Sequence, residues 1–429
     1  MKNIGIFWVL VLTIGACSSV KNLAVDTDVE RTFNQSSLFS NQFTGFSLYD
    51  IESEKFVSGY NDTKRFTPAS NTKLLTMYVA MKSFSDSIPG LLHLSSDDSV
   101  FVQPTGDPTF LDPRFEHQSS LAWLSKSDSI QIVWPENEIE RYGHGWAWDD
   151  YRYDYQPVRN WWPIYGNQVT VGKKNDTISV RPKFFEEYVE VQTEDGLEIG
   201  IDREEKYNLF KFNPAKDTAQ FEETIPFEFS KELLVRLLSD TVQTAFQFAD
   251  RILLNPDTLF TQRLDDVLSL MMKVSDNLIS EQLLILSAWQ HGYTSIDPFI
   301  KHARLIWLSD LNDFVWVDGS GLSRYNLIAP VDQVRLIKKA YDEFGLERLK
   351  NILAVGGESG TIKEWYAAEE PYIFAKTGTL SNNHNLSGFL KTKSGKWMIF
   401  SFMNNHYTVP TDTVKAEMQK LLEGLRDSY

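Results

Sequence analysis

Cysteine is nearly absent from this chain, and histidine is scarce. The 429 residues include 1 cysteine, Cys17, so the monomer can form no disulfide and its globular part offers no thiol nucleophile. The 7 histidines include no His-x-x-x-His or Glu-x-x-His pair on a predicted helix, which argues against a bound metal. The sequence therefore implies no metal and no cofactor.

Positive charge is also in short supply. The chain has 42 Lys and Arg against 58 Asp and Glu, a formal net charge of -16. This balance leaves no basic face for nucleic acid or for an anionic membrane surface. Hydrophobic residues at 42% and charged residues at 23% indicate a soluble, globular protein. The length favours two or three domains.

Long apolar runs are missing except near the N-terminus. Residues 4–14 form one apolar stretch behind Lys2, shorter than the roughly 20 residues that a membrane-spanning helix needs, so we interpret residues 1–16 as an export signal. The sequence Ile14-Gly15-Ala16-Cys17 resembles a bacterial lipobox, in which the cysteine is lipidated. The alternative is an ordinary signal peptide with an accidental cysteine. We expect an exported lipoprotein, anchored at Cys17 in the inner or outer membrane and facing the periplasm.

The periodicity of the remaining chain separates two regions. From about residue 92 to 248, short strand-like runs, turns and aromatic residues dominate, and no long amphipathic helix appears before Lys231. On either side of this region, helical and hairpin patterns prevail, including a helix that starts at or near Ser70. The predicted ranges are strands 43–49 with 55–60, helices 262–272, 278–290, 330–344 and 412–426, and strands 386–391 with 396–403.

These patterns predict an α+β (mixed) protein. The main domain is assigned to residues 18–95 and 245–429, with an antiparallel sheet and helices on its faces. Residues 96–244 are assigned to an inserted, β-rich accessory region.

Three short motifs occur in one order along the chain. They are Ser70-Asn71-Thr72-Lys73 at a predicted helix start, Ser275-Asp276-Asn277 between two predicted helices, and Lys376-Thr377-Gly378-Thr379 in a predicted strand. Stray copies at residues 18–21 and 381–383 lack this context, because one lies in the N-terminal tether and the other follows the third motif. The ordered set indicates a chemically activated serine.

A serine hydroxyl is a poor nucleophile unless a base lies within hydrogen-bond reach. Three residues along a helix return to the same face, so Lys73 can place its amine beside the Ser70 oxygen. Burial and the positive charge of Lys376 are expected to lower the pKa of Lys73. We expect Ser275 to relay a proton towards the leaving amine, and Asn277 to hold Lys73 and a substrate amide.

The third motif suits substrate binding. The backbone N–H groups of Ser70 and Thr379 are expected to form an oxyanion hole, worth about 2.7–4 kcal/mol per donor. The small Gly378 lets a substrate lie along the strand as an additional β-strand. The hydroxyl groups of Thr377 and Thr379, with Lys376, suit a terminal carboxylate.

The three motifs together are the signature of penicillin-binding proteins and serine β-lactamases. The long interval between the first two motifs resembles the penicillin-binding protein 4 family of D-alanyl-D-alanine carboxypeptidases/endopeptidases, the low-molecular-mass class C penicillin-binding proteins. Further matching stretches are Gly106-Asp107-Pro108-Thr109, residues 145–150, residues 318–326, and Gly360-Thr361. The resemblance spans roughly residues 43–405 and implies an antiparallel five-stranded sheet flanked by helices.

The resemblance also implies a substrate. The family acts on peptidoglycan stem peptides through an acyl-enzyme and is inhibited covalently by β-lactams. Asp149 or Asp150 is expected to hold the free amino end of the diaminopimelyl side chain, with Tyr155 lining the same pocket; the alternative is that an aspartate only caps a turn. The chain departs from the family at residues 157–162, where Pro-Val-Arg-Asn-Trp-Trp replaces an expected small, serine-containing stretch.

Three functions follow from these observations. The first is a serine D-alanyl-D-alanine carboxypeptidase/endopeptidase that trims peptidoglycan stem peptides. The second is a β-lactamase or esterase on the same scaffold, which the long insertion disfavours. The third is a non-catalytic wall-binding lipoprotein, which the presence of every motif residue disfavours.

Overall fold

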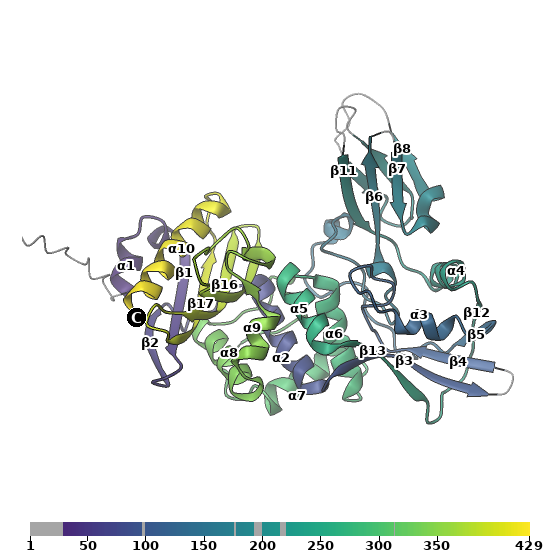
Figure 1. Ribbon diagram of the computed structural model, residues 1–429, viewed down its shortest axis with the longest axis horizontal. Helices are drawn as coiled ribbons and strands as arrows, with labels where there is room; N and C mark the ends of the chain where they lie inside the picture. Colours follow the sequence, from purple (N-terminus) through teal and green to yellow (C-terminus); the bar gives the residue numbers. More distant parts are fainter. Residues whose placement is uncertain (1–28, 97–98, 176, 193–199, 215–219, 313) are drawn as a thin grey trace, which may run out of the picture.

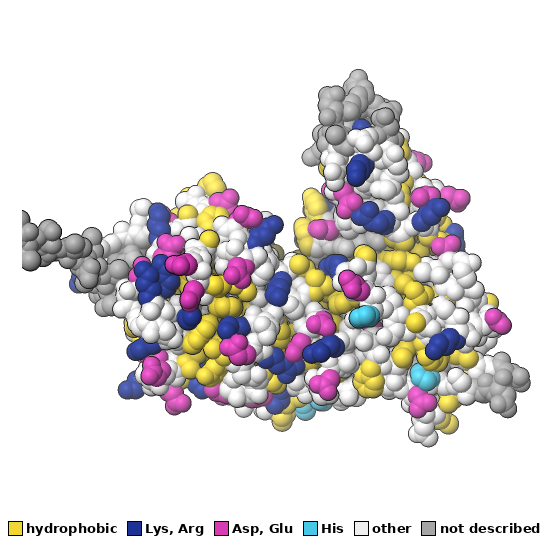
Figure 2. All heavy atoms as spheres, in the orientation of Figure 1, with side chains coloured by type: hydrophobic (Ala, Val, Ile, Leu, Met, Phe, Trp, Pro, Cys, Tyr) yellow, Lys and Arg dark blue, Asp and Glu magenta, His cyan; other side chains and the backbone are white. Residues whose placement is uncertain are grey.

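The computed structural model describes residues 29–96, 99–175, 177–192, 200–214, 220–312 and 314–429. The predicted export signal and Cys17 lie outside the described residues. Within the described ranges, none of the helices is both long enough and apolar enough to cross a lipid bilayer. On the face shown in Figure 2, acidic and basic side chains are interspersed, without a continuous basic surface.

The main sheet is antiparallel throughout and has the order β14-β15-β16-β17-β1-β2. Its strands are β1 (Phe43–Asp50), β2 (Lys55–Tyr60), β14 (Ala354–Val355), β15 (Ile373–Leu380), β16 (Asn383–Lys391) and β17 (Trp397–Asn405). Both predicted hairpins are confirmed. Five long strands form the expected sheet, and β14 adds a two-residue edge strand.

Helices cover both faces of this sheet (Figure 1). Apolar side chains of α1 (Val29–Gln35) and α10 (Thr411–Ser428) pack on one face. The other face packs against a larger helical layer. This layer consists of α2 (Lys73–Ser83), α5 (Leu264–Val274), α6 (Asn277–Gln290), α7 (Ile296–Ile306), α8 (Pro330–Phe344) and α9 (Leu346–Ile352).

The predicted helices over 262–272, 278–290, 330–344 and 412–426 correspond to α5, α6, α8 and α10. Proline at the first position of α8 and Gly345 at its end explain why the prediction of this helix holds at both boundaries. The sequence pattern did not predict α7 and α9.

The inserted region has its own hydrophobic core and two separate lobes (Figure 1). One lobe is a five-stranded sheet of order β12-β5-β4-β3-β13, with α3 and α4 beside it; the other contains two three-stranded sheets, β11-β6-β7 and β8-β10-β9. The bounds are β3 Ser87–Ser96, β4 Ser99–Pro104, α3 Ser119–Leu124, β5 Ser129–Ile132, β6 Gln168–Lys174, β7 Thr177–Arg181, β8 Val189–Val191, β9 Gly200–Arg203, β10 Phe210–Asn213, β11 Gln220–Pro226, α4 Lys231–Val242, β12 Ala245–Phe248 and β13 Asp257–Arg263.

Three strands of the inserted sheet lie outside the predicted insertion, residues 96–244: β3 ends at its first residue, and β12 and β13 follow its last. They nevertheless pair with strands of the inserted sheet, since β3 joins β4 to β13 and β12 pairs with β5. We therefore propose boundaries for the inserted region near residues 86 and 263.

Candidate active site

The three motifs come from three different kinds of local structure. Ser70 lies in a 3-10 turn, η2 (Ala69–Thr72), that runs directly into α2. Ser275 ends α5 in a left-handed conformation with φ +65, and Asp276 then caps α6 by accepting from Ile279 N at 2.7 Å. The third motif lies in β15. The chain reverses sharply at Ser275, so the second motif sits at the junction of two helices.

Lys73 lies at the centre of the assembled motifs and is 0% exposed. Its amine donates to three oxygens: Ser70 Oγ at 3.0 Å, Asn277 Oδ1 at 2.5 Å and the backbone oxygen of Ser320 at 2.7 Å. Asn277 Nδ2 in turn donates to the backbone oxygen of Tyr155 at 2.7 Å, which fixes the orientation of the amide. Residues of the first two motifs therefore meet at one amine.

The nature of these three partners determines where the lone pair of a neutral lysine points. A neutral amine has two N–H bonds and one lone pair. The oxygens of Ser320 and Asn277 can only accept, whereas the Ser70 hydroxyl can also donate. When Lys73 is neutral, its two N–H bonds satisfy the two acceptors and its lone pair faces the Ser70 proton. The geometry thus suits Lys73 as a general base for Ser70.

Lys376 forms the second buried amine of the site. Its Nζ donates to Ser275 Oγ at 2.9 Å and to the Thr377 backbone oxygen at 2.7 Å, and its side chain is fully buried. Burial, followed by the charge of Lys73, holds the pKa of Lys376 well below its usual value. The third motif is thereby joined to the second.

Burial also lowers the pKa of Lys73, from 10.5 to about 8, while the charges of Asp276, Asp318 and Glu281 oppose this shift. Of the two causes expected from the sequence, burial accounts for the lower pKa of Lys73. The repulsion between the two amines lowers the pKa of Lys376 instead. A pKa near 8 leaves a useful fraction of neutral base near neutral pH.

Two glycines allow the backbone to approach the Ser70 turn closely. A Cβ on Gly378 would lie 2.3 Å from the Pro68 oxygen, and one on Gly321 would lie 1.9 Å from the Ala69 oxygen. Ala69 itself has φ +49, a strained value for alanine. The turn that carries Ser70 is therefore packed closely between β15 and the 318–326 loop.

A cleft of about 640 Å³ opens beside Ser70. Its lining includes residues of all three motifs and of the inserted region: Ser70, Gly145, Ala147, Asp150, Tyr155, Gln156, Ser275, Asn277, Gly321, Leu322, Arg324, Thr379, Leu380 and Ser381. Asp150 and Tyr155 therefore share the cleft with Ser70. Asp149 is exposed and does not line it.

Hydrogen bonds fix the remaining predicted binding residues. The hydroxyls of Thr377 and Thr361 lie 2.6 Å apart, and Thr379 Oγ1 lies 2.8 Å from His384 Nδ1. Burial lowers the pKa of His384 to about 3, so this ring is neutral and supplies no charge. The Tyr155 hydroxyl is hydrogen-bonded to Asp150, and burial together with this carboxylate raises the pKa of Tyr155.

Sequence reasoning missed two contributors to the site. The Ser320 carbonyl could not be recognised because a backbone group leaves no signal in the residue type, although the surrounding stretch was singled out. Gln156 was also missed; it lines the cleft, is 2% exposed, and its Oε1 has no hydrogen-bond partner in the described structure. No group of three or more His, Cys, Asp or Glu within the described residues is placed to hold a metal ion.

Comparison with known proteins supports the family resemblance seen in the sequence. The D-Ala-D-Ala carboxypeptidase 3 (S13) family matches residues 237–425. The chain is 22% identical to the D-alanyl-D-alanine carboxypeptidase DacB of Haemophilus influenzae over 90% of each chain. The crystal structure of penicillin-binding protein 4 from Haemophilus influenzae superposes with a TM-score of 0.73 at 20% identity, covering 92% of this chain and 97% of the other. These matches support the penicillin-binding protein 4 family as the family that this chain resembles.

The resemblance to the penicillin-binding protein 4 family extends over the parts of the chain that form the cleft. The S13 match contains the second and third motifs, and the structural match extends over nearly the whole chain. A structure of the Haemophilus influenzae protein in complex with a β-lactam also matches, with a TM-score of 0.62 at 19% identity, over 89% of this chain and 94% of the other. The departure from the family at residues 157–162 needs a separate account.

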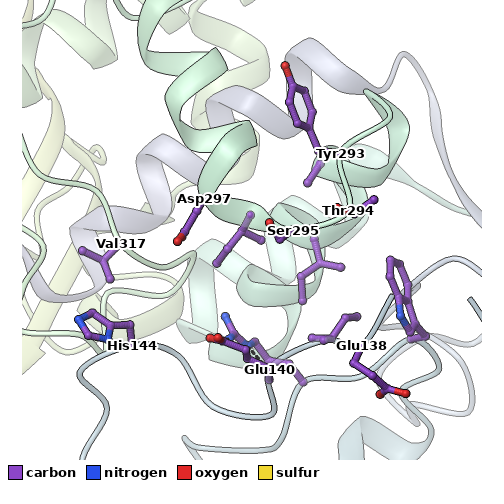
Figure 3. Close-up of a pocket in the computed structure, with 14 residues that line it drawn as sticks. Glu138, Glu140, His144, Tyr293, Thr294, Ser295, Asp297 and Val317 are labelled. Carbon is purple, nitrogen blue, oxygen red and sulfur yellow. Dashed lines mark hydrogen bonds and ion pairs between the residues drawn. The ribbon is translucent and has the colours of Figure 1, made fainter. Parts of the chain in front are cut away.

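A second cavity lies beside this departing stretch, between the inserted region and helices α6 and α7. Its volume is about 340 Å³, and none of its lining residues belongs to the three motifs. In Figure 3, Glu138, Glu140 and His144 lie on one side of the cavity, and Thr294, Ser295 and Asp297 lie on the other. Arg159 also lines the cavity, and its guanidinium group donates to Glu281 on α6.

Proposed function

We propose that this protein is a serine D-alanyl-D-alanine carboxypeptidase that trims peptidoglycan stem peptides through a covalent acyl-enzyme on Ser70. The observation that carries the proposal is the contact of a buried Lys73 amine with the Ser70 hydroxyl and two acceptor-only oxygens. The S13 family match and the similarity to named carboxypeptidases support the same reaction.

In the acylation step, neutral Lys73 accepts the Ser70 proton while the Ser70 oxygen attacks the carbonyl carbon of the D-Ala-D-Ala bond. The oxyanion that forms is stabilised by the backbone N–H groups of Ser70 and Thr379. Both residues line the same cleft, which agrees with this role. Collapse of the tetrahedral intermediate breaks the peptide bond and releases D-alanine.

Departure of D-alanine requires a proton on its amine. Ser275 is the proposed relay, because its hydroxyl accepts from Lys376 and can therefore direct its own proton into the cleft. The proton that Lys73 took from Ser70 replaces the one that the relay gives to the departing amine, so Lys73 is neutral again. Water then attacks the acyl-enzyme and gives a proton to Lys73, which passes it to the Ser70 oxygen as the ester bond breaks; this restores Ser70 and yields the shortened stem peptide.

The terminal carboxylate and the side-chain amine of the substrate are assigned to different sides of the cleft. The terminal carboxylate is assigned to the side of β15, where Lys376, Thr377 and Thr379 lie, and Gly378 leaves room for the substrate backbone. The amino end of the diaminopimelyl side chain is assigned to Asp150, because this carboxylate lines the cleft and Asp149 does not. Tyr155 holds the Asp150 side chain by a hydrogen bond.

The proposed location is the periplasmic side of a bacterial membrane. A cell-wall substrate requires export, and residues 1–16 have the pattern of an export signal. Cys17 is proposed as the lipidated residue that anchors the protein. Endopeptidase action on D-configured cross-links is proposed as a second activity of the same site, since the bond attacked is chemically the same.

The decisive experiment is incubation with defined muropeptides, followed by product analysis. We expect release of D-alanine from pentapeptides, and no release by Ser70→Ala. Intact-mass spectrometry after treatment with a penicillin should show one adduct, located on Ser70. Absence of an adduct, or an adduct at another residue, would refute the assignment of the nucleophile. Rapid loss of the penicilloyl adduct together with inert pentapeptides would favour the β-lactamase alternative.

A further inference from the structure

The inserted region reaches every carboxylate that acts on the catalytic lysine. Asp276, Glu281 and Asp318 are the three acidic groups whose charges favour the protonated form of Lys73. Each of them accepts a hydrogen bond from a side chain of the insertion. The contacts are Arg114 Nη1 to Asp276 Oδ2 at 2.6 Å, Trp146 Nε1 to Asp318 Oδ2 at 2.9 Å, and Arg159 Nη1 to Glu281 Oε2 at 3.1 Å.

The pair of Arg159 and Glu281 is the most deeply buried of these contacts. Their side chains are 3% and 1% exposed, respectively. Removing a carboxylate from water is costly unless it is paired and hydrogen-bonded. Arg159 supplies the paired charge, and its remaining N–H groups donate to the backbone oxygens of Glu140 and Tyr142 at 3.0 and 2.9 Å. The residue is thus held firmly in the inserted region.

The other oxygen of Glu281 leads directly to the catalytic centre. Glu281 Oε1 accepts from Ser320 N at 2.7 Å, and the carbonyl oxygen of the same Ser320 accepts from Lys73 Nζ at 2.7 Å. The preceding Gly319 oxygen accepts from the hydroxyls of Thr76 and Ser280, which clamps the loop between α2 and α6. One residue, Ser320, therefore links Glu281 to Lys73.

We propose that Arg159 and Glu281 are positioning residues for Lys73: together they hold the Ser320 carbonyl against the lysine amine and balance the carboxylate charge beside it. The inference deepens the proposed function and rests on it, because it assumes acyl transfer from Lys73-activated Ser70. It also gives a role to the stretch at residues 157–162, where this chain departs from its family.

The charge balance makes the proposal testable by a pH profile. Lys73 faces three carboxylates, Asp276, Glu281 and Asp318, and the buried amine of Lys376, whose pKa is held well below its usual value. Acylation requires neutral Lys73, so its rate should rise with pH around the pKa of about 8. Replacing Glu281 by Gln removes a negative charge that favours the protonated amine. The pKa of Lys73 then falls. The rising part of the pH profile, which we call the acidic limb, therefore moves to lower pH by about one unit.

The measurement is the second-order rate of acylation by a fluorescent penicillin between pH 5 and 10, with the full-length protein. We expect the acidic limb to move to lower pH in Glu281→Gln. In Arg159→Gln/Glu281→Gln, where both charges are removed, it should return towards its position in the parent protein. Asp265→Asn is the matched control. Asp265 forms a similar Arg–carboxylate pair with Arg348 at 2.7 Å but does not act on Lys73, so its limb should not move.

A second comparison tests whether Glu281 positions the Ser320 backbone. It uses two double variants, so it can be carried out even if Glu281→Gln does not fold. Arg159→Gln/Glu281→Gln keeps an acceptor for the Ser320 N–H, whereas Arg159→Leu/Glu281→Leu removes it, and neither buries an unpaired charge. We expect acylation by the double Leu variant to be at least about tenfold slower than by the double Gln variant, because the base is misplaced. Equal rates, or an unmoved limb in Glu281→Gln, would overturn the inference. A parent protein that is not acylated at all would instead refute the proposed function.

Discussion

Replacement of Lys73 by Met separates the proposed catalytic role of this lysine from its effect on stability. The variant keeps the length and apolar character of the side chain but has no amine. Loss of a positioned general base lowers the rate of the reaction it assists by about 10²–10⁴-fold. We therefore expect acylation by a fluorescent penicillin to fall by this factor, while circular dichroism shows the fold unchanged.

The effect on stability follows from the pKa of the buried amine. Folding lowers the pKa of Lys73 from 10.5 to about 8, which at pH 7 corresponds to a cost of about 3 kcal/mol. Met removes this cost but leaves the oxygens of Asn277 and Ser320 without a donor, at about 1–3 kcal/mol each. At pH 7 these contributions largely offset each other, so the two proteins should have similar free energies of unfolding.

The pH dependence distinguishes the two contributions. Between pH 8 and 10.5 the unfolded lysine binds more protons than the folded one, so the stability of the parent rises with pH in this window. Met has no such dependence. Urea unfolding at pH 7 and pH 10 should therefore show the parent gaining most of about 3 kcal/mol relative to Lys73→Met. The exposed Lys363, replaced by Met, serves as the control and should show no such gain.

Two results would refute this reasoning. A Lys73→Met variant that is acylated at the parent rate would show that another group activates Ser70. A difference in unfolding free energy that stays constant between pH 7 and 10 would show that the buried amine keeps its ordinary pKa.

Three further predictions concern other parts of the structure. Gly321→Ala should slow acylation and, in urea titration, lower the free energy of unfolding by about 1–3 kcal/mol more than Gly395→Ala. The reason is that only a Cβ at residue 321 would meet another atom, so equal losses would contradict the close approach to Ala69. Asp150→Asn should raise the KM for diaminopimelyl stem peptides about tenfold with penicillin acylation unchanged, and Asp149→Asn should not. Cys17→Ser should abolish incorporation of labelled palmitate, and retained label would place lipidation elsewhere.

The proposed catalytic residues were identified from the sequence because each motif is defined by residue type and by local spacing. Ser70 and Lys73 are one helical turn apart, and this short spacing brings the two side chains within reach of each other. The hairpins and α8 were predictable for the same reason, since alternation, Pro330 and Gly345 are local signals. By contrast, the ends of the inserted region were not, because β3 and β13 pair with each other across a long sequence interval.

The sequence by itself was enough to predict the kind of chemistry, the family resemblance and the three motifs that carry it. Only the tertiary structure decided how Lys73 is held, because the third acceptor is the backbone of Ser320 and backbone groups are the same in every residue. Tertiary structure also decided that Arg159 pairs with Glu281 across 122 positions of the chain. A buried charge selects its partner by proximity in space, and no local pattern in the sequence records that choice.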